Sequence, residues 1–176
     1  MRALGRLFDI GTGIMAIADL AAGANTGHRI HMRNFETLAV VLLKGVASAG
    51  TDDVVMTLQE HTAASSGTSA NLAAISEYYI KTETSPLDGD ETWTEVDNTS
   101  SGAAQATLTL AGATYAAHQS VVVFEVEAAS LSAGYEWLSV NIADPGSGGT
   151  IPGAVLYIPH GPKIQRNPAS MVQLNA

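Results

Sequence analysis

Cysteine is absent from this chain of 176 residues. Neither disulfide bonds nor thiolate metal sites can therefore contribute to the fold, and the redox compartment stays open. No apolar run approaches the roughly 20 residues that a membrane-spanning helix needs. An apolar stretch near the N-terminus follows Arg2 and Arg6, but Asp9 and several glycines interrupt it. A cleaved signal peptide is the less favoured interpretation of that stretch.

Charged residues are also scarce, at 14% of the chain against about a quarter in ordinary globular proteins. Alanine, glycine, serine and threonine take their place. A surface with so little charge suggests that part of it faces other protein instead of water. The alternative is an ordinary monomer with a bland surface.

The net charge of −9 is unevenly distributed. Residues 34–162 contain two lysines against fifteen acidic residues, whereas residues 1–33 and 163–176 are slightly basic. An acidic body repels phosphate, so we expect neither nucleic acid nor an anionic membrane as a partner. The basic ends suit docking on an acidic protein, or they simply keep the chain ends solvated.

The strongest strand pattern lies in residues 120–144, SVVVFEVEAASLSAGYEWLSVNIAD. In its first run Val122, Phe124 and Val126 share one face, with Glu125 and Glu127 on the other. A second alternating run covers residues 135–142. The small, polar link between the runs predicts a hairpin at the centre of the sheet.

Residues 36–46 are apolar on both faces, which predicts a strand covered on both sides, by the N-terminal segment or by a neighbouring subunit. This strand is expected to form a hairpin with residues 54–59. Pro159 and Pro162 are expected to keep the last strand, residues 154–158, from continuing in a central ladder. In all, eight to nine short strands predict an all-β fold, an antiparallel β-sandwich or jelly roll.

The expected domain organisation has three parts. Residues 1–26 form an extended arm, residues 27–162 the sandwich, and residues 163–176 a tail. We expect deletion of residues 1–26 to leave a folded domain.

No catalytic constellation emerges from the sequence. Asp52 and Asp53 precede a predicted strand and Glu60 and His61 end it, so the two pairs are roughly 20 Å apart or more. No serine lies in a GxSxG motif. The glycine-rich loop PGSGG lacks the lysine and helix of a phosphate-binding loop. We expect no enzymatic activity and no cofactor.

Metal binding is also not expected. Asp88, Asp90 and Glu91 resemble the start of a calcium loop, but the regular ligand spacing of an EF-hand is missing, and a charged hairpin turn is favoured. His28 and His31 are close in sequence, yet their odd spacing in a strand points them to opposite faces.

Tyr135 and Trp137 share one face of a predicted strand with Ser139 and Asn141. Aromatic rings beside hydroxyl and amide groups are typical of carbohydrate-binding modules. The alternative is that this face is covered by protein, because aromatic residues are also favoured at buried contacts.

Five segments in this order resemble small all-β virion proteins of tailed bacteriophages, of the head decoration (cement or minor capsid) type. The segments are ANTGHRIHMRNFETLAVVLLKG, DDVVMTLQEHT, WTEV, VVVFEVEAASLSAGYEWLSVNIAD and GAVLYIPHGPK. The resemblance covers residues 25–163.

The resemblance implies a structural protein without a catalytic site, made in a bacterial host cytoplasm and bound to the exterior of a capsid. Its partners would be the major capsid protein at capsomer junctions and further copies of itself, a trimer being favoured. A phage tail or baseplate component and a carbohydrate-binding module remain the alternatives. The residues expected at the capsid or subunit interface are Arg2, Arg6, Leu7, Phe8, Arg29, Arg33, Val41, Leu43, Tyr135 and Trp137.

Overall fold

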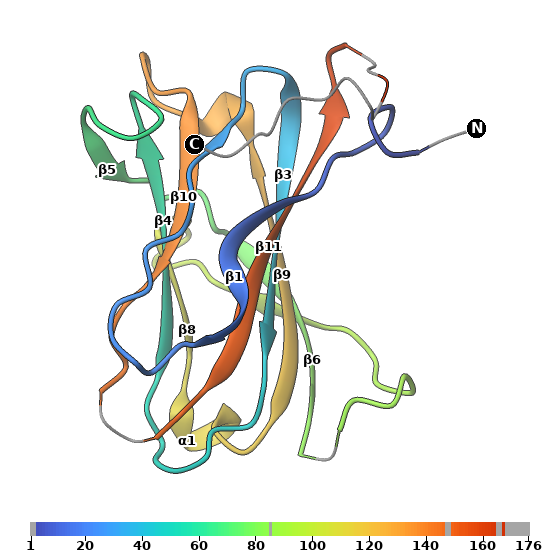
Figure 1. The fold of residues 1–176 in the computed structure, drawn as a ribbon, viewed down its shortest axis with the longest axis vertical. Coiled ribbons are helices and arrows are strands. Elements are labelled where there is room, and N and C mark those ends of the chain that lie inside the picture. The colour runs from blue at the N-terminus through green and yellow to red at the C-terminus, as the bar shows by residue number, and fades with distance from the viewer. Residues whose placement is uncertain (1–2, 85, 147–148, 165–166, 168–176) are drawn as a thin grey trace.

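The computed structural model describes residues 3–84, 86–146, 149–164 and 167. Within them, eleven strands form two antiparallel sheets that pack face to face as a sandwich (Figure 1). This confirms the all-β sandwich predicted from the sequence. Helical structure in the described residues is limited to a one-turn helix, α1 (Gly112–Tyr115), and a 3₁₀ turn at Ala128–Ser130.

The larger sheet has the order β1-β11-β3-β9-β6-β7 and the smaller one β2-β10-β4-β5, with β8 also paired to β4. The larger sheet consists of β1 (Gly11–Asp19), β3 (Phe35–Lys44), β6 (Glu77–Glu83), β7 (Thr94–Asp97), β9 (Gln119–Glu127) and β11 (Pro152–Pro162). The smaller sheet consists of β2 (Ile30–His31), β4 (Val54–His61), β5 (Ser69–Asn71), β8 (Thr107–Leu110) and β10 (Trp137–Ile142).

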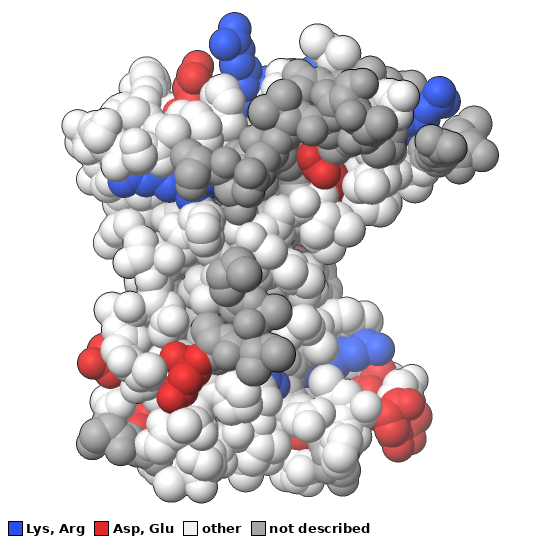
Figure 2. All heavy atoms as spheres, in the orientation of Figure 1, with Lys and Arg blue, Asp and Glu red and all other residues white. Residues whose placement is uncertain are grey.

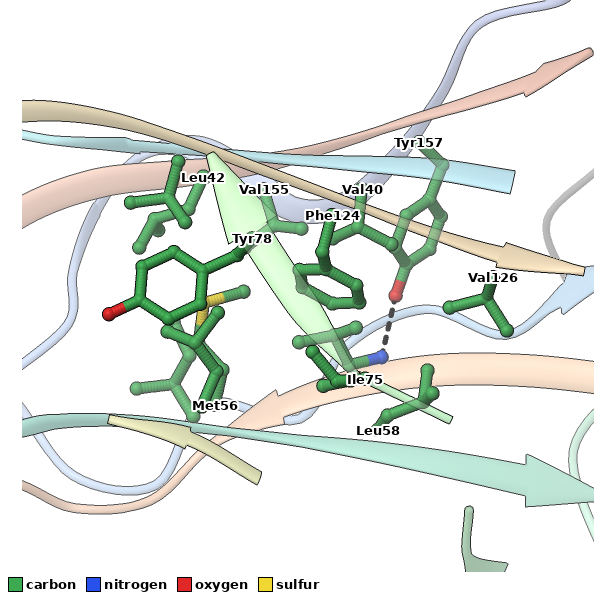
Figure 3. Packing of buried hydrophobic residues seen from close by; sticks show 14 of the residues in the cluster. Val40, Leu42, Met56, Leu58, Ile75, Tyr78, Phe124, Val126, Val155 and Tyr157 are labelled. Carbon is green, nitrogen blue, oxygen red and sulfur yellow. Dashed lines mark hydrogen bonds between the residues drawn. The ribbon is translucent and has the colours of Figure 1, made fainter. Parts of the chain in front are cut away.

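Alternation along the strands fills the space between the sheets. Val40 and Leu42 of β3 and Phe124 of β9 point inward, toward Met56 and Leu58 of β4 (Figure 3). Each is at most 2% exposed, because a residue pointing inward from one sheet meets the inward residues of the other. The core is therefore the contact between the two apolar faces.

Tyr157 joins the two sheets by a hydrogen bond as well as by packing (Figure 3). Its ring is fully buried, and its hydroxyl accepts a hydrogen bond of 2.8 Å from the backbone N–H of Val140 in β10. Strand β2 pairs only with Trp137 and Leu138 of β10, so it ends before it reaches Val140. The Tyr157 hydroxyl therefore accepts the hydrogen bond that a longer β2 would have accepted. A side chain at Gly27 would collide with the carbonyl of Val140, so glycine lets the chain pass close to β10 here.

Both predicted hairpins are wrong. Strand β9 belongs to the larger sheet and β10 to the smaller one, and β3 and β4 are divided in the same way. Between β9 and β10 the chain crosses the end of the sandwich through the 3₁₀ turn, where the buried Glu60 carboxylate accepts a hydrogen bond of 2.8 Å from the N–H of Ser132. When two consecutive strands lie in opposite sheets, each still has one face that points into the core. The alternating sequence pattern is therefore the same as for a hairpin within one sheet.

The expected arm is shorter than residues 1–26. Strand β1 pairs with β11 at the edge of the larger sheet, and Ile14 and Leu20 belong to the core. The sandwich thus begins at Gly11 and not at residue 27. The alternation of apolar and polar residues is weak in this segment, because many of its residues are glycine or alanine. The expected tail lies mostly outside the described residues.

The prolines near the C-terminus do not end the central ladder. Strand β11 pairs with β3 as far as Pro162, with Pro159 opposite Leu38. The Pro159 carbonyl accepts a hydrogen bond from the N–H of Asp9. Because N and O of one strand residue point to the same side, the nitrogen without a hydrogen also faces away from β3. A single proline is tolerated in that position.

Candidate binding surfaces

The outward face of the larger sheet is apolar across three adjacent strands. Val41 lies opposite Val123 on one side and Leu156 on the other, and Leu43 lies opposite Val121 and Ala154. Leu43 is 41% exposed. We call this set the outer apolar face, and it comprises Val41 and Leu43 of β3, Val121 and Val123 of β9, and Leu156 and Ile158 of β11.

The flank that carries the larger sheet is hollowed between two projections (Figure 2). The upper projection lies where the chain begins in Figure 1, and the lower one lies at the loop between β6 and β7. Strand β1 continues the sheet at its edge and does not extend over this face as the expected arm would have done. A concave apolar surface suits a convex protein partner.

The upper projection includes residues 3–10, which we call the terminal hook. A turn closes it through a hydrogen bond of 2.8 Å from the N–H of Gly5 to the Phe8 carbonyl, and Gly5 has a φ of 78°, which glycine adopts without strain. The N–H of Asp9 fastens the hook to Pro159. Three of its apolar side chains stay exposed, namely Leu4 at 39%, Leu7 at 61% and Ile10 at 56%.

A groove of about 400 Å³ lies at the opposite end of the flank. We call it the basal groove. The end of β3, the starts of β9 and β11, and the loop after β6 line it, with mainly apolar contributions from Leu43, Leu87, Val121, Pro152 and Ala154.

Lys44 closes the sandwich beside the basal groove. The side chain is 4% exposed, and its Nζ donates to the carbonyls of Tyr115 at 2.7 Å and of Gly45 and His118 at 3.0 Å. Burial lowers the pKa of Lys44 to about 8, while the carbonyls favour its charged form. This lysine is thus a structural element that fixes the chain around α1.

The outward face of the smaller sheet has a different character. Asn71, Gln59 and Asn141 form a row of amides across β5, β4 and β10, joined by hydrogen bonds of 3.0 Å and 2.6 Å. Next to it, Trp137 stacks on His31, with ring centroids 4.4 Å apart and planes at 9°. The face is polar and almost uncharged, and one side of the Trp137 ring is already covered.

His61, the last residue of β4, lies near the row of amides and is buried. Its Nδ1 lies 2.7 Å from the Ser69 hydroxyl and its Nε2 lies 2.8 Å from the Ser139 hydroxyl. Burial, with Arg29 nearby, lowers the pKa of His61 to about 4. A neutral ring with both nitrogens bonded to hydroxyls stabilises the fold, and such a weak base is poorly suited to general base catalysis near neutral pH.

The structure separates the predicted interface residues into two groups. Arg6, Leu7 and Phe8 lie in the terminal hook, and Val41 and Leu43 lie on the outer apolar face. Tyr135, Trp137, Arg29 and Arg33 lie on or near the smaller sheet, and Arg2 lies outside the described residues.

Arg29 has a structural role in addition to any at an interface. Its guanidinium donates to the carbonyls of Ala63 at 2.7 Å and Ser66 at 2.8 Å, so it holds the loop that follows β4. Arg33 is exposed.

Sequence reasoning missed four of the six residues of the outer apolar face, and it did not predict the basal groove. Val121 and Val123 carried a usable signal, because they make the run SVVVF apolar on both sides. Leu156 and Ile158 carried the same signal in AVLYI. Leu87 carried no such signal, because the sequence does not show that the loop after β6 packs beside the ends of β3, β9 and β11.

The acidic turn brings Asp88, Asp90 and Glu91 together, with carboxylate oxygens within 4.8 Å of one another. The Glu91 carboxylate accepts hydrogen bonds from the N–H groups of Asp88 and Gly89, as in a self-stabilised turn. The Asp52 and Asp53 pair lies before β4, and Glu60 and His61 lie at its far end.

Comparison of the sequence with protein-family models and with curated proteins found no match. In the described part of the chain, no helix is long and apolar enough to cross a membrane.

Proposed function

We propose that the chain is a non-enzymatic virion structural protein of the head decoration type, which binds the exterior of a bacteriophage capsid. The partner is the major capsid protein, and the location is the virion surface after assembly in the bacterial cytoplasm. The proposal rests on the resemblance of residues 25–163 to such proteins and on the outer apolar face as a surface for a protein partner.

The outer apolar face carries the argument. Six side chains from three adjacent strands form a continuous surface, and the concave flank adds depth to it. Exposed apolar patches of this kind mark protein interfaces more often than free surface. Binding that is stronger to the finished shell than to its precursors stabilises the finished shell by mass action.

The test is quantitative co-sedimentation with virus particles from the source, after mass spectrometry has established how many copies each particle carries. A Val123→Asp variant places a charge on the outer apolar face, directly opposite Val41 of the central strand β3, and is expected to bind particles at least tenfold more weakly. The matched control is Thr107→Asp, which adds the same charge to an exposed position on the other sheet and is expected to bind like the wild type.

Equal binding of Val123→Asp and wild type would overturn the proposed surface. Absence of the chain from purified particles would overturn the virion role itself. A copy number of a few per hundred shell proteins would instead favour a tail or baseplate component.

The second candidate function is carbohydrate binding through Tyr135 and Trp137. It is favoured by the amide row beside Trp137, because amides and an aromatic ring are the groups that hold sugar hydroxyls and sugar faces. A Trp137→Ala variant that stays folded but loses binding on a glycan array would support this function. A wild-type protein that binds no glycan would exclude it.

A further inference from the structure

The two ends of the hollowed flank complement one another. The terminal hook presents exposed Leu4, Leu7 and Ile10, and the basal groove presents a concave, mainly apolar surface. One end thus has apolar projections and the other an apolar recess.

The terminal hook itself and the rim of the basal groove also carry opposite charges. Arg6 is exposed in the hook, and the acidic residue of the hook, Asp9, is only 9% exposed. Beside the groove, the loop that contributes Leu87 continues into the acidic turn of Asp88, Asp90 and Glu91. Figure 2 shows acidic side chains gathered on the lower projection of the flank, with a basic side chain beside them. A cationic hook and an acidic groove rim attract one another.

The hook of a chain cannot fill the groove of the same chain. Strand β11 connects the two sites, since its Pro159 and His160 hold the hook and its first residues, Pro152 to Ala154, line the groove. At about 3.3 Å per residue, the sites are roughly 20 Å apart along the strand. A second molecule must therefore supply the hook.

We propose that the basal groove of one copy receives the terminal hook of a second copy, with Leu7 in the groove and Arg6 near the acidic turn. The contact joins different surfaces of the two copies, so it is a head-to-tail contact that forms a closed ring when the rotation between copies closes. The inference goes beyond shell binding, because the contact forms between free copies.

Disulfide trapping tests the contact directly, and the absence of native cysteine makes the result unambiguous. A Leu7→Cys chain is mixed under mild oxidation with a Leu87→Cys chain that carries a tag, so that the mixed pair is recognised by its mass. The control replaces Leu87→Cys by Thr99→Cys, an exposed position outside the groove lining. We expect mixed disulfide dimers to form at least tenfold faster with Leu87→Cys than with Thr99→Cys. Equal rates would overturn the proposal.

Complementation gives a second, independent measurement by sedimentation velocity. Wild type is expected to sediment as a species larger than the 18.2 kDa monomer. Leu7→Asp and Leu87→Asp, each with an unchanged circular dichroism spectrum, are expected to sediment as monomers. Their mixture is expected to contain dimers, because one intact hook and one intact groove remain.

A monomeric wild type, or variants that assemble like the wild type, would overturn the head-to-tail contact. Neither result would bear on shell binding, which is measured with particles and with Val123→Asp.

Discussion

At the scale of single residues, the buried Tyr157 hydroxyl is a polar group that joins the two sheets. Removing its hydroxyl leaves the buried N–H of Val140 without its partner, and an unsatisfied buried donor costs about 1–3 kcal/mol. We predict that Tyr157→Phe lowers the free energy of unfolding by that amount in urea denaturation.

Tyr79→Phe is the matched control for Tyr157→Phe, because the Tyr79 hydroxyl is bonded only to exposed carboxylates of Glu77 and Glu95. Its expected effect is within about 0.5 kcal/mol. A Tyr157→Phe variant as stable as the control would show that the hydroxyl contributes nothing beyond packing.

His61 makes stability depend on pH in the acid range. Its pKa is lowered from 6.5 to about 4 by burial, so between these values the unfolded chain binds a proton that the folded chain does not. The contribution of His61 is complete above pH 6.5 and is lost as the pH falls toward 4. At about 1.4 kcal/mol per pKa unit, the loss is on the order of 3 kcal/mol.

The measurement is the free energy of unfolding from pH 7 to pH 4, in wild type and in His61→Gln. The variant is expected to be less stable at pH 7 and to lose less stability on acidification. His28→Asn, at an exposed position, is expected to retain the wild-type loss. Parallel pH profiles for wild type and His61→Gln would contradict the assignment to His61.

At the scale of elements, strand β1 divides the N-terminal segment into two parts with different roles. Deleting residues 1–10 removes only the terminal hook, and we predict a folded protein with less than about 1 kcal/mol lost. Deleting residues 1–22 also removes buried Ile14 and Leu20 and exposes the edge of β11. At roughly 2–5 kcal/mol for each large core side chain, that variant should lose at least about 4 kcal/mol or fail to fold.

Thermal unfolding followed by circular dichroism measures both deletions. Equal melting temperatures for the two deletions would mean that β1 contributes nothing to the sandwich. We therefore expect the chain to fold without residues 1–10, but no longer expect it to fold normally without residues 1–26.

The sequence predicts the inward face of each long strand better than its partner. Val122, Phe124 and Val126 were correctly identified as one face, because a period of two is visible within the strand. Whether β9 continues into the same sheet or crosses to the other was not visible, since a hairpin and a crossing need the same alternation. Pairing across long sequence distances leaves no mark in a single sequence.

The candidate site was predicted only in part for a related reason. Val41 and Leu43 stood out as apolar residues on the second face of a strand. Their neighbours Val123 and Leu156 come from other parts of the chain, so the continuous surface exists only after β3 is flanked by β9 and β11. The predicted interface residues fall into two groups because β3 and β10 belong to different sheets.

At the scale of the whole molecule, the larger sheet is held together by pairings between distant segments. Strand β1 pairs with β11, and β11 pairs with β3. The chain loses the entropy of closing these long loops before the strand contacts begin to stabilise it. We therefore predict slow folding, on the order of tens of milliseconds to seconds in stopped-flow fluorescence. Complete folding within microseconds would contradict this pairing of distant strands.

The position of β11 between β1 and β3 also sets an order of events during synthesis. Of the strands that the structure describes, β11 is the last to leave the ribosome, yet two earlier strands of the larger sheet need it as their neighbour. While the chain grows, β1 and one edge of β3 have no native partner. The larger sheet can therefore close only after residues 152–162 have emerged, and until then the nascent chain exposes strand edges that a chaperone can shield.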